Sequence, residues 1–241
     1  WSRRLARFSL VVLGLSLLLV RLREPSIEGL APVAGAYLFV LVALGLALLA
    51  FVRIWQKGHR GVSMAAGALL LCLVLLAPAG YVGFLLATRP ALADVSTDVD
   101  DPPAFSRSMA ALTVRHGRVP PEIPPERRRL QRQAYPKIAP IVLEQPADAA
   151  FALARRAARA LGWQIIEVSH PGGRSGAGRI EAVAHGHLLR FAEDITIRVK
   201  PRVDGSRIDI RSASRIGSHD LGANAKRISA FADEIDLLLE K

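Results

Sequence analysis

Residues 195–215 read ITIRVKPRVDGSRIDIRSASR and decide the fold of the carboxyl-terminal part of the chain. Two runs of alternating apolar and polar residues are joined by Asp204-Gly205, a preferred two-residue hairpin turn. The stretch therefore predicts an antiparallel hairpin with two different faces. The apolar face, expected in the core, consists of Ile195, Ile197, Val199, Ile208 and Ile210. The polar face, expected to be open, consists of Thr196, Arg198, Lys200, Asp209, Arg211 and Arg215.

The arginines of this polar face are candidate binding residues. An open sheet face that carries Arg198, Arg211 and Arg215 can hold an anionic group or dock a partner. The alternative is a solvated face with cross-strand charge pairs, such as Arg198 with Asp209. Both interpretations stay open at this point.

Around the hairpin, the pattern predicts a compact domain over residues 137–241. The expected elements are a strand at 138–143, a helix at 147–160, strands at 163–169, 179–186, 195–200 and 206–215, and a helix at 221–239. This β-α-β4-α order predicts an α+β domain with one curved antiparallel sheet that is backed by two helices.

Three apolar segments precede this domain, at residues 5–22, 35–54 and 62–88. Roughly 20 helical residues cross a hydrocarbon core of about 30 Å, so each segment is long enough to span a membrane. The first segment also has features of a signal peptide, but it lacks a small-x-small cleavage site and a further span follows. We expect a three-helix transmembrane anchor over residues 1–90. Its spans hold no Asp, Glu, His or Lys deep within them, which argues against a proton or ion path.

The basic residues that flank the spans predict the topology. Arg3, Arg4, Arg7, Arg53, Lys57 and Arg60 lie on one side of the membrane, and Arg21, Arg23 and Arg89 lie on the other. Because Lys and Arg collect on the cytoplasmic side of short loops, the amino terminus is expected inside. Three crossings then place the domain outside the cytoplasm. We expect a bacterial inner-membrane protein with a periplasmic carboxyl-terminal domain.

Residues 91–136 are rich in proline, which predicts an extended connector between the anchor and the domain. Arg127, Arg128 and Arg129 are candidates to contact anionic lipid headgroups or an acidic partner, and a solvated helix over 125–133 is the alternative. The chain has a net charge of +11. No aromatic residues interleave with the arginines for base stacking, and a periplasmic domain meets no nucleic acid, so nucleic acid is not an expected partner.

Three polar strings suggest a shared corner of the fold. They are DVSTDVDDPPAF at 94–105, DIRSASRIG at 209–217 and DLGANAKRI at 220–228. The candidate residues of this corner are Asp94, Asp98, Ser212, Ser214, Asp220, Asn224 and Arg227. Asp220 is well placed to cap the last helix, and a hydrolytic site at the corner is a weaker alternative.

These strings resemble the signatures of the bacterial and plastid family called domain of unknown function fourteen ninety-nine. The resemblance covers about residues 94–241, and members that carry preceding membrane helices resemble the whole chain. It implies the architecture, and it brings no activity, substrate or cofactor. It also leaves open that the corner residues only dock the connector.

No motif in the sequence points to catalysis, a cofactor or a metal. His185 and His187 supply too few ligands for a metal site, and the neighbours Ser218, His219 and Asp220 cannot converge as a hydrolytic triad. The glycine-rich stretch at 172–178 precedes a strand, whereas a phosphate-binding loop precedes a helix.

We therefore expect a non-catalytic integral inner-membrane protein. The leading interpretation is that the protein acts as an accessory, stabilising or assembly subunit of a larger membrane protein complex. The alternative is binding of a lipid or another amphiphile by the periplasmic domain, because helices over a curved sheet can enclose an apolar cavity.

Overall fold

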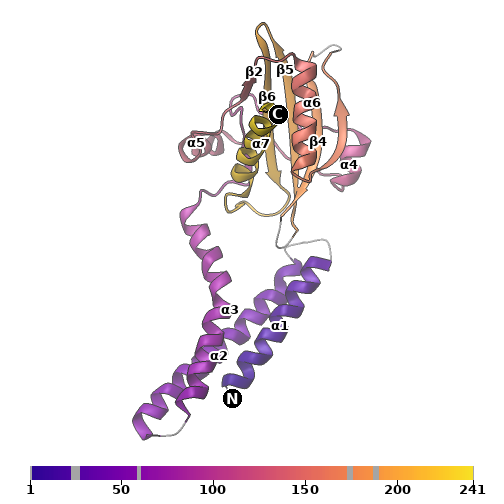
Figure 1. The fold of residues 1–241 in the computed structure, drawn as a ribbon. Helices are drawn as coiled ribbons and strands as arrows, with labels where there is room; N and C mark the ends of the chain where they lie inside the picture. Colours follow the sequence, from indigo (N-terminus) through magenta and orange to yellow (C-terminus); the bar gives the residue numbers. More distant parts are fainter. Residues whose placement is uncertain (1, 23–27, 59–60, 173–175, 187–189, 241) are drawn as a thin grey trace. The chain divides into compact units, whose positions relative to one another are not determined.

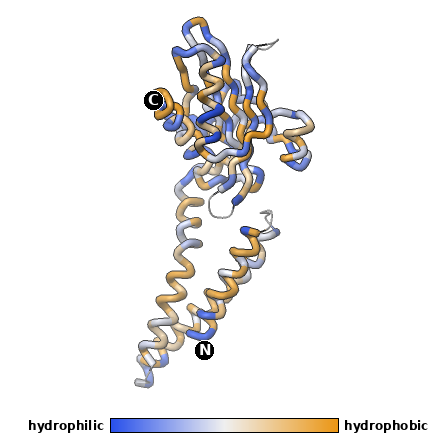
Figure 2. The backbone as a smooth tube through the Cα atoms, turned by 45° about the vertical axis from the view of Figure 1, so that its right-hand side comes forward, coloured by the Kyte–Doolittle hydropathy of each residue, from blue (hydrophilic) through white to orange (hydrophobic). Residues whose placement is uncertain are grey.

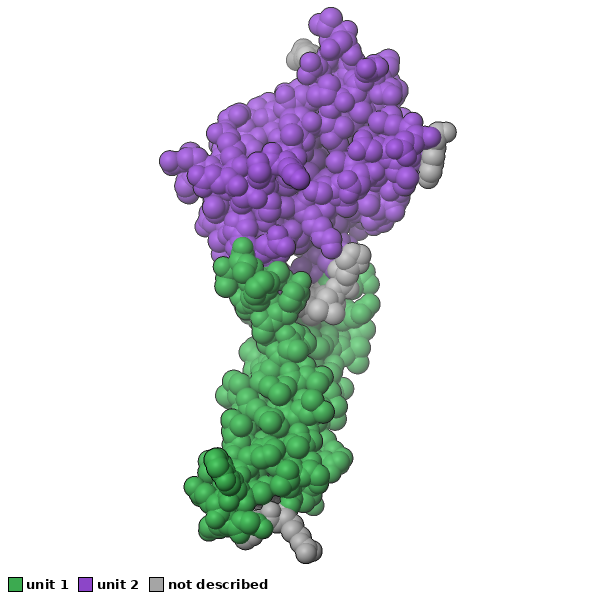
Figure 3. Space-filling view, turned by 60° about the vertical axis from the view of Figure 1, so that its left-hand side comes forward, with its two compact units in different colours: residues 1–88, 187–190 green, residues 89–186, 191–241 purple. Residues whose placement is uncertain are grey.

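A computed structural model describes residues 2–22, 28–58, 61–172, 176–186 and 190–240. The chain forms two compact units, which Figure 3 shows in different colours. The first unit contains residues 1–88 and 187–190, and the second contains residues 89–186 and 191–241. The unit boundary after Thr88 falls close to the expected end of the anchor.

The first unit contains three long helices, α1 (Ser2–Leu22), α2 (Ala31–Lys57) and α3 (Val62–Thr88). A short 3-10 turn, Glu28–Leu30, precedes α2. All three helices are long and apolar enough to cross a membrane, and Figure 2 shows their predominantly apolar colouring. The few side chains buried between them are mostly small, as in Ala36, Ala43 and Cys72, so the helices approach closely. These helices fit the expected transmembrane anchor.

The second unit combines a sheet with helices, as Figure 1 shows. Its strands are β1 (Asp94–Ser96), β2 (Ile141–Leu143), β3 (Gln164–Ser169), β4 (Gly178–His185), β5 (Ala192–Arg202) and β6 (Gly205–Ser214). Its helices are α4 (Met109–Val114), α5 (Pro125–Ala134), α6 (Ala147–Ala160) and α7 (Ala223–Leu239). The expected α+β class is confirmed, and the β-α-β4-α order holds from β2 onward.

The sheet is antiparallel in every pairing, in the order β1-β6-β5-β4-β3, and β2 pairs with another part of β6. The β5–β6 hairpin closes at the Arg202–Gly205 pair, as its Asp-Gly turn predicts. The five apolar residues of its inner face are all fully buried. They pack with Phe151 of α6 and Phe231 of α7, and both helices lie against the same face of the sheet (Figure 1).

The opposite face of the sheet is not open, so the expectation of an open polar face was wrong. Thr196 and Asp209 are fully buried there, and Arg211 is only 4% exposed. The cover comes from the stretch expected to be a separate extended connector. This stretch forms β1, which extends the sheet beside β6, and it also contains α4 and α5. Residues 91–136 thus belong to the second compact unit.

Candidate functional site

The side chain of Arg211 holds the connector against the sheet. Its guanidinium binds both carboxylate oxygens of Asp94, with Nε–Oδ1 at 2.9 Å and Nη2–Oδ2 at 2.7 Å. It also donates to the carbonyl oxygens of Pro103 (3.3 Å) and Pro121 (2.5 Å). Its guanidinium lies 4.9 Å from the centre of the Phe105 ring. With its donors used inside the domain, Arg211 is a structural residue, unlike the expected exposed contact.

A buried ionic group lies beneath α4. Arg115 and Glu181 form an ion pair in which both side chains are fully buried. Arg115 also lies near Asp194, with Nε–Oδ1 at 3.2 Å, and Asp194 binds Arg215 with Oδ1–Nη2 at 2.8 Å. Burial raises the pKa of Glu181, and the hydrogen bonds from Arg115 and Thr196 oppose that rise. No local pattern in the sequence pairs Arg115 with Glu181, because 66 residues separate them.

The acidic start of the connector neutralises the other end of the polar face. Asp98 pairs with Arg207 at 2.5 Å, and Asp101 pairs with Arg198 and Lys200 at 3.0 Å each. The expected cross-strand pair of Arg198 with Asp209 is present, with Nη2–Oδ2 at 2.9 Å. Arg198 is thus engaged by carboxylates, and it is not part of a free binding face.

The other corner residues connect β6 to α7. Asn224 accepts from the Ser212 hydroxyl (2.7 Å) and donates to Ser214 Oγ (3.0 Å) and to the carbonyl of Ala93 (3.0 Å). Arg227 donates to Ser212 Oγ (3.1 Å). These contacts dock the start of the connector on the strand-helix corner. They give the corner residues a structural role.

Asp220 accepts a hydrogen bond from the first turn of the last helix, as predicted, although Gly222 occupies the N-cap position itself. Its carboxylate accepts from the backbone amides of Gly222 (2.8 Å) and Asn224 (2.7 Å), which lie before and in the first turn of α7, where the helix supplies no acceptor. The neighbouring His219 accepts from the Leu221 amide (2.9 Å), and its Nε2 lies 3.1 Å from the Arg89 carbonyl. Ser218, His219 and Asp220 therefore do not form a triad.

The expected helix that carries the arginine run is present as α5. Arg128 donates to the carbonyls of Ile123 (2.8 Å) and Asp100 (3.1 Å), so it fastens α5 to the connector. Arg127 donates to the carbonyl of Ala91. Arg129 is exposed on α5.

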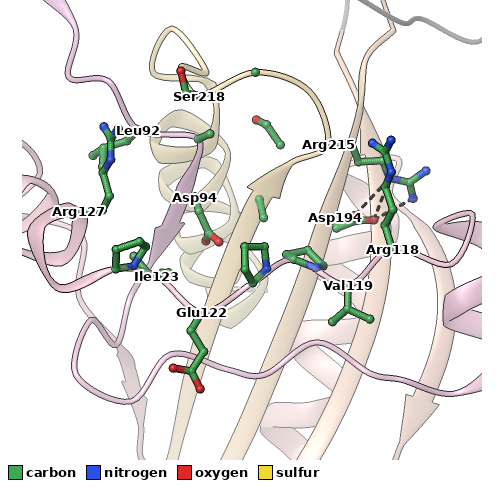
Figure 4. A pocket seen from close by; sticks show the side chains of 17 residues that line it. Leu92, Asp94, Arg118, Val119, Glu122, Ile123, Arg127, Asp194, Arg215 and Ser218 are labelled. Atoms are coloured by element: carbon green, nitrogen blue, oxygen red, sulfur yellow. Dashed lines mark hydrogen bonds and ion pairs between the residues drawn. The ribbon is translucent and has the colours of Figure 1, made fainter.

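A cavity of about 430 Å³ lies between the connector and the end of β6, and Figure 4 shows its lining. Its walls come from β1, the segment 118–124, the carboxyl-terminal end of β6 and the loop that follows β6. Apolar groups contribute much of the wall: Leu92, Ala93, Val119, Pro120, Pro121, Ile123, Pro124 and Ala213. Charged groups also reach it: Asp94, Arg118, Glu122, Arg127, Asp194 and Arg215.

The charges around this pocket are unevenly compensated. Asp94 is paired with Arg211, and Asp194 is paired with Arg215. Burial raises the pKa of Asp94, and the Arg211 guanidinium opposes that rise. Arg118 is exposed and has no side-chain partner among the residues that the structure describes. The pocket therefore offers an apolar interior and an uncompensated guanidinium.

The described residues contain no group of three or more His, Cys, Asp or Glu side chains arranged to hold a metal ion. His187 and part of the glycine-rich stretch, residues 173–175, lie outside the described residues.

The structure combines three helices that are long and apolar enough to cross a membrane with an α+β domain whose sheet includes part of the connector. A family model, Protein of unknown function (DUF1499), matches residues 94–235. The chain belongs to this family, which confirms the resemblance noted from its three polar strings. Among curated proteins, no match to the chain was found.

Proposed function

We propose that this chain is a non-catalytic membrane-anchored binding protein whose outer domain holds an anionic amphiphile in the pocket beside β6. The observation that carries the proposal is the 430 Å³ cavity with apolar walls and an exposed arginine, Arg118. Small-molecule sites have volumes of roughly 300–1,000 Å³, mostly apolar walls and a few polar groups that orient the ligand.

Photo-crosslinking of the full chain in phosphatidylcholine nanodiscs tests this proposal. The probe is a hexadecanoate that carries a diazirine in its chain. We expect saturable adducts in peptides that contain residues 118–124 and 213–218. Adducts confined to the spans at residues 2–88 would contradict the proposal.

A pocket-filling variant makes the experiment specific. Ala213 lines the pocket and is buried on the connector side of β6, so Ala213→Phe places a ring inside the cavity. We expect this variant to lose the pocket adducts and to keep the adducts in the spans. Val203→Phe is the control, because Val203 is fully exposed on the β5–β6 turn. The loss of pocket adducts supports the proposal only if the near-ultraviolet circular dichroism of Ala213→Phe matches that of the unmodified chain, which shows that the variant is folded.

The proposal places the outer domain on the periplasmic side of a bacterial inner membrane. The uneven distribution of Lys and Arg around the three spans supports this orientation. The single cysteine, Cys72, lies within α3, so a Cys72→Ser background allows one reporter cysteine at a time. We expect Val203→Cys to react with a membrane-impermeant maleimide in intact cells, and Lys57→Cys to react only after lysis. The reverse pattern would overturn the orientation.

A role as an accessory subunit of a membrane complex is the second candidate. The arginine face that first favoured it is covered, but α3 offers a different surface. Every side chain from residue 77 to residue 84 is exposed, including Tyr81 and Phe84. A photoreactive amino acid at Tyr81 tests this candidate, and a discrete adduct with another membrane protein is the expected result. Adducts with lipid alone would count against it.

A further inference from the structure

We propose that Arg118, beside Arg215, is the headgroup subsite of the pocket, and that the occupant is a single-chain amphiphile with one carboxylate or phosphate. This inference rests on the proposed function and names its ligand class. It follows from the charges at the two ends of the cavity and from the volume of the cavity.

The end of the pocket near Arg118 carries excess positive charge. Figure 4 shows Arg118 and Arg215 at this end, beside Asp194. The carboxylate of Asp194 is already shared between Arg215 and Arg115, and Arg115 is further paired with Glu181. Asp194 and Glu181 are thus already paired with Arg215 and Arg115, and Arg118, which lines the same pocket, has no carboxylate partner among the described residues. An anion from outside the chain completes this group.

The remaining charged groups do not compensate Arg118. The Asp94 carboxylate is bound on two sides by Arg211. The Glu122 side chain points away from the other labelled side chains in Figure 4. Arg127 lies at the opposite end, where its guanidinium donates to the carbonyl of Ala91. Arg127 therefore already has an acceptor within the chain, whereas the Arg118 guanidinium has none among the described residues. Guanidinium groups bind carboxylates and phosphates well.

The rest of the lining suits an acyl chain. Leu92 and Ile123 lie at the end opposite Arg118 in Figure 4, and three prolines of the segment 118–124 continue the apolar wall. The volume of about 430 Å³ is near the lower limit for ligand pockets, which favours one chain over two. Leu92 follows Thr88, the last residue of α3, by four residues, which is at most about 14 Å of extended chain. This short distance along the chain between α3 and a residue of the pocket wall is consistent with a ligand that comes from a membrane.

Competition against the photoreactive hexadecanoate tests the inference on the full chain in nanodiscs. Three competitors separate the chemical sources: hexadecyl phosphate carries an anion and a chain, hexadecanol carries the chain alone, and inorganic phosphate carries the anion alone. We expect hexadecyl phosphate to compete at least about tenfold more strongly than hexadecanol, because a hydrogen bond between charged groups contributes that much. Inorganic phosphate at the same concentration is expected not to compete.

Variants assign the preference to Arg118. In Arg118→Gln we expect the tenfold preference for hexadecyl phosphate to fall to about one, and in Arg118→Lys we expect part of it to remain. Arg156→Gln is the matched control, because Arg156 is exposed on α6, on the other face of the sheet, and it does not line the pocket. This control must keep the preference. Both side chains are exposed and make no hydrogen bond or ion pair with another described residue, so both variants should fold.

The outcomes separate the two proposals. Equal competition by hexadecyl phosphate and hexadecanol in the unmodified chain, or an unchanged preference in Arg118→Gln, would overturn the headgroup subsite and leave amphiphile binding intact. Effective competition by inorganic phosphate would show a site for free anions and would also overturn it. Failure of the probe to label the pocket of the unmodified chain would instead refute the proposed function itself.

Discussion

The guanidinium of Arg115 and the carboxylate of Glu181 form an ion pair with both side chains fully buried, although 66 residues separate them in the chain. Arg115 ends α4 in the connector, and Glu181 lies in β4 of the sheet. Glu181 also accepts from the Ser106 amide (3.0 Å) and the Thr196 hydroxyl (2.8 Å). The pair therefore joins the connector to the sheet at a place where water cannot replace a lost partner.

Removal of one member of this pair is expected to destabilise the domain strongly. Arg115→Met leaves the Glu181 carboxylate buried without its cation, which costs about 3–5 kcal/mol for such pairs. Urea unfolding of the full chain in micelles, followed by near-ultraviolet circular dichroism, measures the loss. The double variant Arg115→Met/Glu181→Leu should recover part of it, because the Glu181 carboxylate is then no longer buried without its cation and Asp194 keeps its pair with Arg215. A single variant as stable as Arg156→Met would show that the pair contributes little.

The inner face of the β5–β6 hairpin could be predicted from the sequence because the alternation of apolar and polar residues is a local pattern. Ile195, Ile197 and Val199 alternate with polar residues, and burial against α6 and α7 follows from this period alone. The Asp204-Gly205 turn then sets the register of the hairpin.

The connector that covers the other face of the sheet has no such local pattern. Arg211 meets Asp94 across 117 residues, and β1 has only three residues, too few for an alternation to stand out. The proline-rich connector shows no alternation of apolar and polar residues that would reveal which surface it covers. The pocket could not be predicted for the same reason, because its walls combine segments that lie far apart in the sequence: β1, residues 118–124 and the end of β6. Of the candidate residues, Asp94, Arg127, Ser214 and Arg215 do line that pocket.

Acidification is expected to weaken the contact between α4 and β3 through Glu167. Hydrogen bonds from Ser108 (2.5 Å) and Ser106 (2.8 Å) lower the pKa of Glu167 below its ordinary value of 4.5. A carboxylate with a lowered pKa stabilises the fold above the ordinary value, and this stabilisation is lost as the pH falls through the folded-state pKa.

The variant Glu167→Gln isolates this effect. We expect it to unfold at a lower temperature than the unmodified chain at pH 7, and we expect the difference to narrow as the pH falls below 4.5. Thermal unfolding between pH 3 and pH 7 provides the measurement. A difference that stays constant over this range would contradict the assignment to the Glu167 carboxylate.

The cap at Asp220 is expected to stabilise α7 without taking part in binding. Asp220→Ala removes the acceptor for the Gly222 and Asn224 amides and should cost about 1 kcal/mol. Asp220→Asn keeps an acceptor oxygen and should cost less. Urea unfolding reports the stability, and labelling by the photoreactive hexadecanoate reports the pocket, which Asp220 does not line. Loss of labelling in a folded Asp220→Asn variant would instead place Asp220 in the site.

A close backbone approach is expected to make Gly205 difficult to replace. Its φ of +140° is rarely adopted by other residues, and a Cβ there would lie 2.0 Å from the Leu143 carbonyl oxygen and 2.9 Å from Glu144 Cα. Both atoms belong to the backbone, so Gly205→Ala must displace either the β5–β6 turn or the end of β2.

Gly162→Ala is the matched control, because Gly162 also has a positive φ, +72°, but open space around its Cβ position. We expect Gly162→Ala to cost about 1 kcal/mol, the conformational penalty alone, and Gly205→Ala to cost at least about twice as much in urea unfolding. An equal loss of unfolding free energy in the two variants would contradict this prediction, because it would mean that the backbone at the end of β2 moves aside at little cost.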